Sequence, residues 1–259
     1  MLGSTILKEL TSKRSDIETP LGNKTLIWAA GTLEKNLSTN STAIELQKFT
    51  KIIQEHSARK FSTLVYLSSA GSLYKSNKNI TSSEFSEITP ANAYGFLKQA
   101  EEEIIRSNFN QFFDKIFIIR LANVYGRAFT DLDKLGLIDR AIYCAINNLD
   151  LIINVDKTSR KNYGYKGDYA KKIVTILENH NKFGSSEIIN LGPSFSYSIE
   201  ELISIIENYF KTKIKITYTN QNVNETVLIK SENEKFISIN KELDQWINVE
   251  EYLAEFGRY

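Results

Sequence analysis

Tyr94 and Lys98 are the two side chains whose types and spacing most directly predict chemistry. Residues four apart are neighbours on one face of a helix, so these positions would bring a phenol close to an ammonium group. A free tyrosine has a pKa near 10 and is only about 0.1% ionised at pH 7, so it accepts protons poorly until a fixed positive charge favours the phenolate. Lys98 can supply that charge, which predicts a tyrosine that exchanges a proton with a substrate.

A run of serines distinguishes this pair from a chance match. Ser68, Ser69 and Ser72 close a β-rich run about 22 to 26 residues before Tyr94. Taken separately, the pair is explained by a packed tyrosine beside a solvated lysine, and the serines by a capped turn. Together they bring hydroxyl, phenol and ammonium groups into one strand-loop-helix unit, which favours a single site.

The elements that must position this site follow from hydrophobic periodicity. Short β-rich runs alternate with amphipathic helical patterns, which predicts an α/β fold with a largely parallel sheet. Three runs end in small or polar residues, and open α/β sheets bind ligands at the carboxyl ends of their strands. The expected strands are residues 25–31, 63–71, 115–123, 149–155, 187–192 and 213–218, and the expected helices are 41–56, 94–107, 135–147, 168–179, 198–210 and 249–256.

Composition excludes several other classes of protein. Hydrophobic residues make up 42% and charged residues 24%, with a net charge of +1, which is typical of a globular protein and argues against nucleic-acid binding. One cysteine and two histidines exclude an intramolecular disulfide and a Cys/His metal cluster. The sequence lacks an apolar run of about 18 residues and a signal-peptide core. We therefore expect a metal-free cytoplasmic protein that does not bind membranes.

Further motifs accompany the Tyr94/Lys98 pair. They are residues 65–74 with the strand-end Tyr74, then Glu84 and Pro90, Glu101 or Glu102 behind Lys98, residues 120–126 with the pattern R-x-x-N-V-Y-G, Asp168 within residues 160–170, and residues 189–192. Together these motifs resemble the extended short-chain dehydrogenase/reductases, specifically the NAD-dependent epimerase/dehydratase group that acts on nucleotide sugars. The resemblance covers nearly the whole chain in family order.

This resemblance implies a Rossmann-like sheet, shortened at the N-terminus, with a smaller C-terminal substrate lobe. The dinucleotide-binding domain would comprise residues 1–125 and about 164–195, and the substrate lobe residues 126–163 and 196–259. The implied activity is NAD(P)-dependent epimerisation, dehydration or reduction of a nucleotide sugar in surface-polysaccharide sugar synthesis, by a chain that could form a homodimer. The alternative is a non-catalytic relative that keeps the fold as a binding or scaffold subunit.

In the family, the tyrosine is the acid/base, the lysine lowers the pKa of that tyrosine and holds the nicotinamide ribose, and a serine or threonine hydrogen-bonds the reacting oxygen. Tyr94 and Lys98 match the first two roles, and both also count as cofactor-binding residues. Asn123 resembles the substrate-contacting asparagine of the family, although a polar strand-end cap explains it equally well.

Two ways of counting give different residues for the hydroxyl role. Counting back four residues from Tyr74 gives Ala70, whereas counting from Tyr94 favours Ser69. Ser72 lies two residues beyond Ala70 and would share its face if the chain stayed extended. Ser72 is therefore our first choice, and Ser69 the second, for both catalysis and substrate binding.

The N-terminal region departs from the family, which begins with a strand and a G-x-x-G-x-x-G loop that holds the pyrophosphate. Gly3 looks like the third of these glycines, and the other expected cofactor-binding residues are Ala29, Ala30 and Gly31. Only about a dozen residues separate Leu10 from the strand at residue 25, too few for the segment that binds the adenosine half. Asp16 is a weak stand-in for the ribose-binding acid.

Two explanations compete for this departure: either residues upstream of Met1 belong to the protein, or the cofactor half-site is shortened. In both cases we expect the printed chain to bind NAD or NADP weakly, with a dissociation constant in the high-micromolar range or above.

Overall fold

A parallel four-stranded sheet forms the centre of the protein. The computed structural model describes residues 2–13, 25–31, 37–57, 62–77, 80–109, 112–126, 135–219, 225–240 and 245–256. The sheet has the order β1-β2-β4-β9, formed by β1 (Thr25–Trp28), β2 (Thr63–Ser69), β4 (Lys115–Leu121) and β9 (Ser186–Leu191). The predicted α/β fold with a parallel sheet is confirmed.

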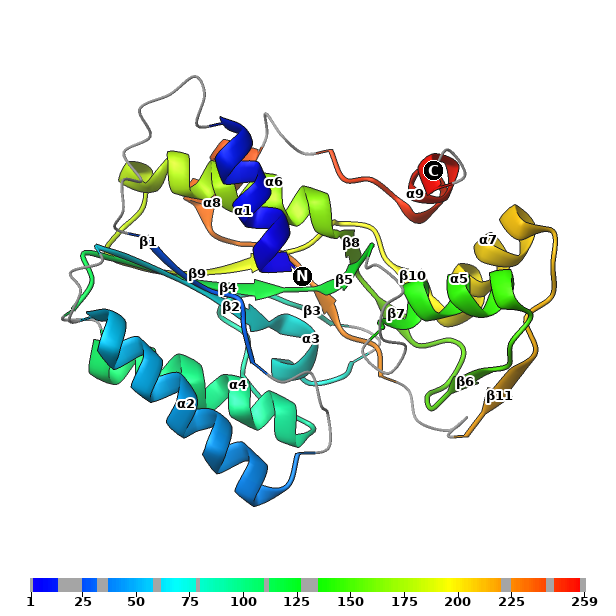
Figure 1. Ribbon diagram of the computed structural model, residues 1–259, viewed down its shortest axis with the longest axis horizontal. Coiled ribbons are helices and arrows are strands. Elements are labelled where there is room, and N and C mark those ends of the chain that lie inside the picture. Colours follow the sequence, from blue (N-terminus) through cyan, green and yellow to red (C-terminus); the bar gives the residue numbers. More distant parts are fainter. Residues whose placement is uncertain are drawn as a thin grey trace.

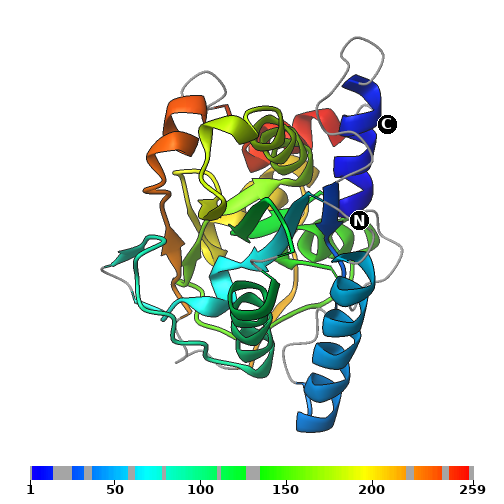
Figure 2. The ribbon, with the colours of Figure 1, turned by 90° about the vertical axis from the view of Figure 1, so that its left-hand side faces the viewer.

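Helices cover both faces of this sheet (Figure 1). One face packs against α1 (Leu2–Lys13), α6 (Lys166–Glu178) and α8 (Glu234–Asn240), and the other against α2 (Thr39–Ser57) and α4 (Ala93–Ile104). Figure 2 shows α2 and α4 side by side on their face.

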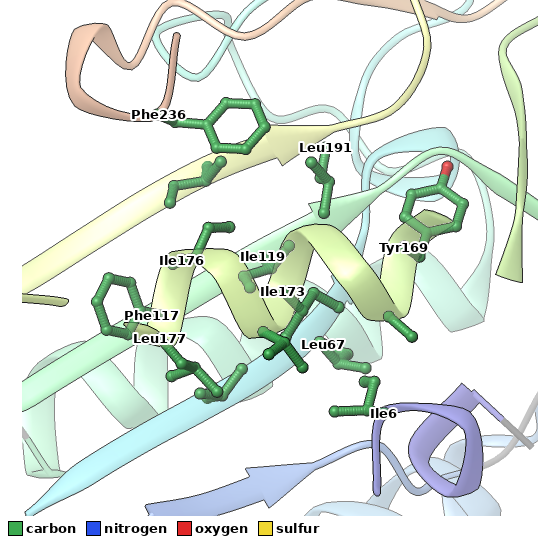
Figure 3. Packing of buried hydrophobic residues seen from close by; sticks show 14 of the residues in the cluster. Ile6, Leu67, Phe117, Ile119, Tyr169, Ile173, Ile176, Leu177, Leu191 and Phe236 are labelled. Atoms are coloured by element: carbon green, nitrogen blue, oxygen red, sulfur yellow. The ribbon is translucent and has the colours of Figure 1, made fainter. Parts of the chain in front are cut away.

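Alternation along β2 explains this layering. Val65 and Leu67 belong to the core that also contains Ile6 of α1 and Ile173 of α6, where Figure 3 shows Leu67. Leu64 and Tyr66 belong to the core that contains Phe49 of α2. Both faces are therefore buried, which is why the central strands appear in the sequence as nearly continuous apolar runs.

A second hydrophobic core lies beside the carboxyl edge of the sheet. It is built from α5 (Leu137–Asn147), α7 (Ile199–Phe210), α9 (Val249–Phe256), β6 (Leu151–Ile153) and β11 (Ile216–Tyr218). Short ladders connect it to the sheet: β5 (Asn123–Tyr125) with β8 (Tyr163–Tyr165), β7 (Arg160–Lys161) with β10 (Tyr197–Ser198), and β3 (Thr81–Ser82) with β12 (Leu228–Ile229).

The structure corrects several expected elements. The strand expected at 63–71 ends at Ser69, and the chain turns into the short helix α3 (Ala70–Leu73), which buries Ala70 and Leu73 on one side. The strand expected at 115–123 breaks at Ala122, because the next residues leave the sheet to pair with β8. The segment expected to be a polar connection before Lys235 leads into α8.

Two further short helices follow longer elements. A π-helical turn (Ile105–Phe109) continues α4, and a 3₁₀ turn (His180–Lys182) follows α6. Within the described ranges, no helix is long and apolar enough to cross a membrane, and no cluster of three or more His, Cys, Asp or Glu side chains could hold a metal ion. Asp16 lies outside the described residues.

Candidate active site

Tyr94 and Lys98 lie on the first two turns of α4. Asn92 caps this helix, because its side-chain oxygen accepts a hydrogen bond from the Gly95 amide at 2.9 Å. Tyr94 is half-buried and Lys98 is 3% exposed. The Lys98 Nζ atom lies 5.6 Å from the centroid of the Tyr94 ring, so the helix brings the phenol and the ammonium group together.

Gly95 allows the start of α4 to approach α3 closely. A Cβ atom at this position would lie 2.3 Å from the Ser72 carbonyl oxygen and 2.8 Å from Pro90 Cβ, both far below normal contact distances. A larger residue would force the helix away from the turn. The glycine after Tyr94 is therefore what places the phenol-bearing turn directly against Ser72.

The structure brings the two candidate hydroxyls together by a route that the sequence did not predict. The chain does not stay extended after Ala70, so the argument that put Ser72 on the face of Ala70 is wrong. Instead, the α3 turn returns Ser72 toward Ser69, whose Oγ donates a hydrogen bond to Ser72 Oγ at 3.3 Å. Ala70 is fully buried in a small apolar cluster with Tyr74.

Lys98 also contacts Tyr66 of β2 and Glu101, one turn further along α4. Its Nζ donates hydrogen bonds to Glu101 Oε2 at 2.8 Å and to the Tyr66 hydroxyl at 3.2 Å. Tyr66 in turn donates to the same Glu101 oxygen. Burial, followed by the charge of Glu101, raises the pKa of Tyr66 well above its ordinary value, so Tyr66 remains a phenol.

The predicted cofactor-binding residues lie at the end of β1. Ala29, Ala30 and Gly31 are exposed, and a Cβ atom at Gly31 would lie 3.8 Å from Lys98 Nζ. Gly31 has a φ of +116°, a backbone conformation that side-chain-bearing residues rarely adopt. A Cβ atom at Gly3, at the start of α1, would lie 3.1 Å from Ala29 Cβ. These small residues therefore form one continuous strip that ends beside Lys98.

Asn123 lies close to the serine turn, beside Gly71. A Cβ atom at Gly71 would lie 3.8 Å from its Oδ1, and its Nδ2 donates to the Asn162 carbonyl at 3.1 Å. Asn162 is buried and is itself held by the Pro193 carbonyl and the Ile229 amide. Asn162 was not predicted from the sequence, where its signal was a polar residue before the aromatic β8.

A second buried network lies behind the site. Glu102 accepts hydrogen bonds from Nε and Nη2 of Arg120, the latter at 2.7 Å, and also from Ser68. Arg120 also donates to the Tyr74 hydroxyl at 2.8 Å, and Tyr74 donates to Asn190. Ser68, Arg120 and Asn190 are register partners on β2, β4 and β9, so this network joins three strands to α4.

A cleft of about 620 Å³ lies elsewhere in the molecule. It opens beside α7 and the β7-β10 ladder, and its walls contain none of the predicted site residues. Its Arg160 is paired with Glu201 and also binds Ser196 through both backbone and side-chain oxygens. We therefore place the candidate site at the carboxyl edge of the sheet.

The chain is similar to known proteins in both sequence and fold. The sequence model of the NAD dependent epimerase/dehydratase family matches residues 26–192, well over half of the chain. A curated relative, the putative UDP-glucose 4-epimerase of Methanocaldococcus jannaschii, is 30% identical over 145 residues, which cover 56% of this chain and 46% of the relative. This chain thus matches about half the length of that relative.

Two solved structures share the fold. The NAD complex of the UDP-glucose 4-epimerase of Thermus thermophilus has a TM-score of 0.79 at 14% identity, with 98% of this chain and 93% of that chain covered. MoeE5, solved with UDP-glucose and NAD, has a TM-score of 0.80 at 16% identity, with 99% and 95% covered. At these identities the likeness shows the fold alone.

Proposed function

The chain belongs to the NAD dependent epimerase/dehydratase family, and from that premise we propose that it is an NAD(P)-dependent enzyme that epimerises, dehydrates or reduces a nucleotide sugar. The single observation that carries the proposal is the position of the Tyr94/Lys98 pair. Lys98 Nζ lies 3.8 Å from the Cβ position of Gly31 at the exposed end of β1, and the turn of α4 that bears Tyr94 packs against the Ser72 carbonyl, in the segment that carries the Ser69/Ser72 hydroxyls. A redox site needs a cofactor on one side of the acid/base and a substrate on the other.

The residues at the end of β1 fit a dinucleotide. The backbone at Gly31 is exposed and has no Cβ, which lets a flat ring or a ribose approach Lys98 closely. Ala29 and Ala30 extend this open strip toward Gly3 at the start of α1, where helix N–H groups favour phosphate. Bound NAD(P)⁺ would supply the hydride acceptor, held by Gly3, Ala29, Ala30, Gly31 and Lys98.

Tyr94 would move the proton in this reaction. As a phenolate, it takes the proton of a sugar hydroxyl while the hydrogen on the same carbon leaves with its electron pair, and the C–O bond becomes a carbonyl. In the return direction, the phenol gives the proton back to the carbonyl oxygen. Lys98 stabilises the phenolate, and Ser72 with Ser69 hydrogen-bonds the reacting oxygen.

Asn123 would hold the sugar, because its amide lies beside Gly71 in the serine turn. Its tie to Asn162 fixes the direction of the amide against the β5-β8 ladder. The product would be a nucleotide sugar of the type used in polysaccharide synthesis. We further propose a cytoplasmic protein that assembles as a homodimer, which sedimentation velocity would test.

One observation favours a second candidate, a non-catalytic subunit. Counted back from Tyr74, the position where the family places its hydroxyl is Ala70, which is buried in apolar surroundings. A chain that only binds a nucleotide sugar would tolerate this alanine. It would bind the sugar without converting it, and Tyr94→Phe would then leave its behaviour unchanged.

The test is incubation of the purified protein with UDP-glucose, UDP-glucuronic acid and UDP-N-acetylglucosamine, each with NAD⁺ or NADP⁺. We expect chromatography to show conversion of at least one sugar, and that conversion to disappear in Tyr94→Phe. Binding of a nucleotide sugar by calorimetry, with no conversion under any combination, would support the non-catalytic candidate instead.

A further inference from the structure

Glu101 is buried directly against the proposed acid/base pair. Its side chain is 2% exposed and that of Lys98 4%, and the Lys98 Nζ to Glu101 Oε2 distance is 2.8 Å. The Tyr66 hydroxyl closes this triangle, because it contacts both the ammonium group and the carboxylate. The ammonium group of Lys98 is therefore already paired with a carboxylate within the site.

The other charged groups near Lys98 do not alter this pairing. Arg120 of β4 faces the same helix, but it is bound to the adjacent Glu102. From β2 the titratable neighbour is Tyr66, and α3 contributes no charged residue. The charged side chains of α2 that are described lie at or near the surface, namely Glu45, Lys48, Lys51 and Glu55.

We propose that Glu101 is a positioning residue that fixes Lys98 beside Tyr94 and offsets its positive charge, so that Tyr94 remains a phenol to higher pH than Lys98 alone would allow. This inference rests on the proposed function, since it concerns the protonation of the same acid/base. A positive charge favours the phenolate, and a carboxylate within hydrogen-bond distance of that charge cancels much of its field at the phenol. The site would thereby favour Tyr94 as proton donor at neutral pH.

The direct test is an ultraviolet titration of Tyr94 that needs no turnover. The tyrosinate absorbance of the protein is measured against pH, and the curve of Tyr94→Phe in the same background is subtracted. Glu101→Gln keeps an oxygen acceptor for Lys98 and removes only the charge. We expect it to move the Tyr94 titration to lower pH by about one unit.

Glu103→Gln is the matched control, because it removes the same charge from the same helix at a side chain that is 68% exposed. We expect it to leave the Tyr94 titration unchanged. An equal shift in Glu103→Gln, or no shift in Glu101→Gln, would overturn the proposal.

A double variant covers the case in which Glu101→Gln leaves Lys98 uncompensated and the protein unfolds. Lys98→Met/Glu101→Gln removes both buried charges, and we expect its Tyr94 titration to stay within about half a unit of wild type. If Tyr94 in the double variant titrates at a pH as high as in Lys98→Met alone, Glu101 has no effect on Tyr94.

Turnover then separates this inference from the proposed function. If the enzyme is active, Glu101→Gln should shift the acid limb of the kcat/KM pH profile to lower pH, in parallel with the Tyr94 titration. If the wild type converts no nucleotide sugar, the proposed function fails, while the ultraviolet titration still decides whether Glu101 controls Tyr94.

Discussion

Glu101 and Glu102 are consecutive residues of α4, and each forms a buried ion pair, yet the two pairs differ in what their cations can still do. Arg120, the partner of Glu102, donates from Nε, Nη1 and Nη2 to Glu102 and Tyr74, which ties the helix to the sheet. Lys98, the partner of Glu101, has three donors, of which two meet Glu101 and Tyr66. The remaining side of Lys98 faces Tyr94 and Gly31.

This difference separates a structural pair from a reactive one. A buried pair whose cation donates from each of its three nitrogens to fixed side chains holds elements together, and losing one partner leaves an unpaired buried charge. A pair whose ammonium group also faces exposed backbone, as Lys98 does at Gly31, can in addition bind a ligand. The following predictions test whether the two adjacent pairs divide stability and chemistry in this way.

The largest effect should come from Tyr94→Phe, on the reactive side. We expect turnover to fall by about 10² to 10⁴-fold, because one proton-transfer group is lost while the ring is kept. Nucleotide-sugar binding and the free energy of unfolding should change by less than about 1 kcal/mol. Steady-state kinetics, calorimetry and urea unfolding check this, with Tyr209→Phe on α7 as the control. Turnover like that of wild type would remove Tyr94 from the reaction.

Arg120→Met should have the largest effect on stability. It leaves Glu102 buried without its cation, and we expect a loss of about 3–5 kcal/mol in urea unfolding. Arg106→Met is the matched control, because Arg106 is 54% exposed and lies 3.8 Å from Glu103, and we expect a change within about 0.5 kcal/mol. The double variant Arg120→Met/Glu102→Gln should recover part of the loss. Equal losses in the free energy of unfolding for Arg120→Met and Arg106→Met would contradict the structural role of the Arg120–Glu102 pair.

Gly31→Ala should weaken cofactor binding. A φ of +116° strains a residue with a Cβ by about 1–3 kcal/mol, and the local backbone would shift beside Lys98. We expect NAD(P)⁺ binding to weaken by about tenfold in calorimetric titration. Gly136→Ala, at an ordinary φ of −68° and with room for a Cβ, should not change it. Unchanged affinity in Gly31→Ala would place the cofactor elsewhere.

The smallest effect is the ranking of the two serines. Ser72→Ala should slow kcat more than Ser69→Ala, by a factor of about 3 to 10, as expected for one lost hydrogen bond to the reacting oxygen. Ser107→Ala, at an exposed serine after α4, serves as the control. The reverse order would assign the hydroxyl role to Ser69.

Much of the architecture was predictable because it depends on local periodicity. The alternation of β-rich runs and helical patterns predicted the parallel sheet and most of its helices, since each pattern shows which side of an element must be buried. Apart from α8, which the sequence did not predict, the failures occurred at element ends. The α3 turn after Ser69 and the break at Ala122 arise where the chain leaves the sheet to pair with distant segments, and periodicity carries no information about that.

The sequence by itself determined that Tyr94 and Lys98 would be neighbours, because residues four apart on a helix meet whatever surrounds them. It also determined that small and hydroxyl residues would follow the strands. Only the tertiary structure decided which glutamate faces Lys98, that Ser72 folds back to Ser69, and that Asn162 holds Asn123. The first two features depend on how α4 and α3 pack on the strands. The third depends on contact between segments about 40 residues apart in the sequence, which only the packed fold brings together.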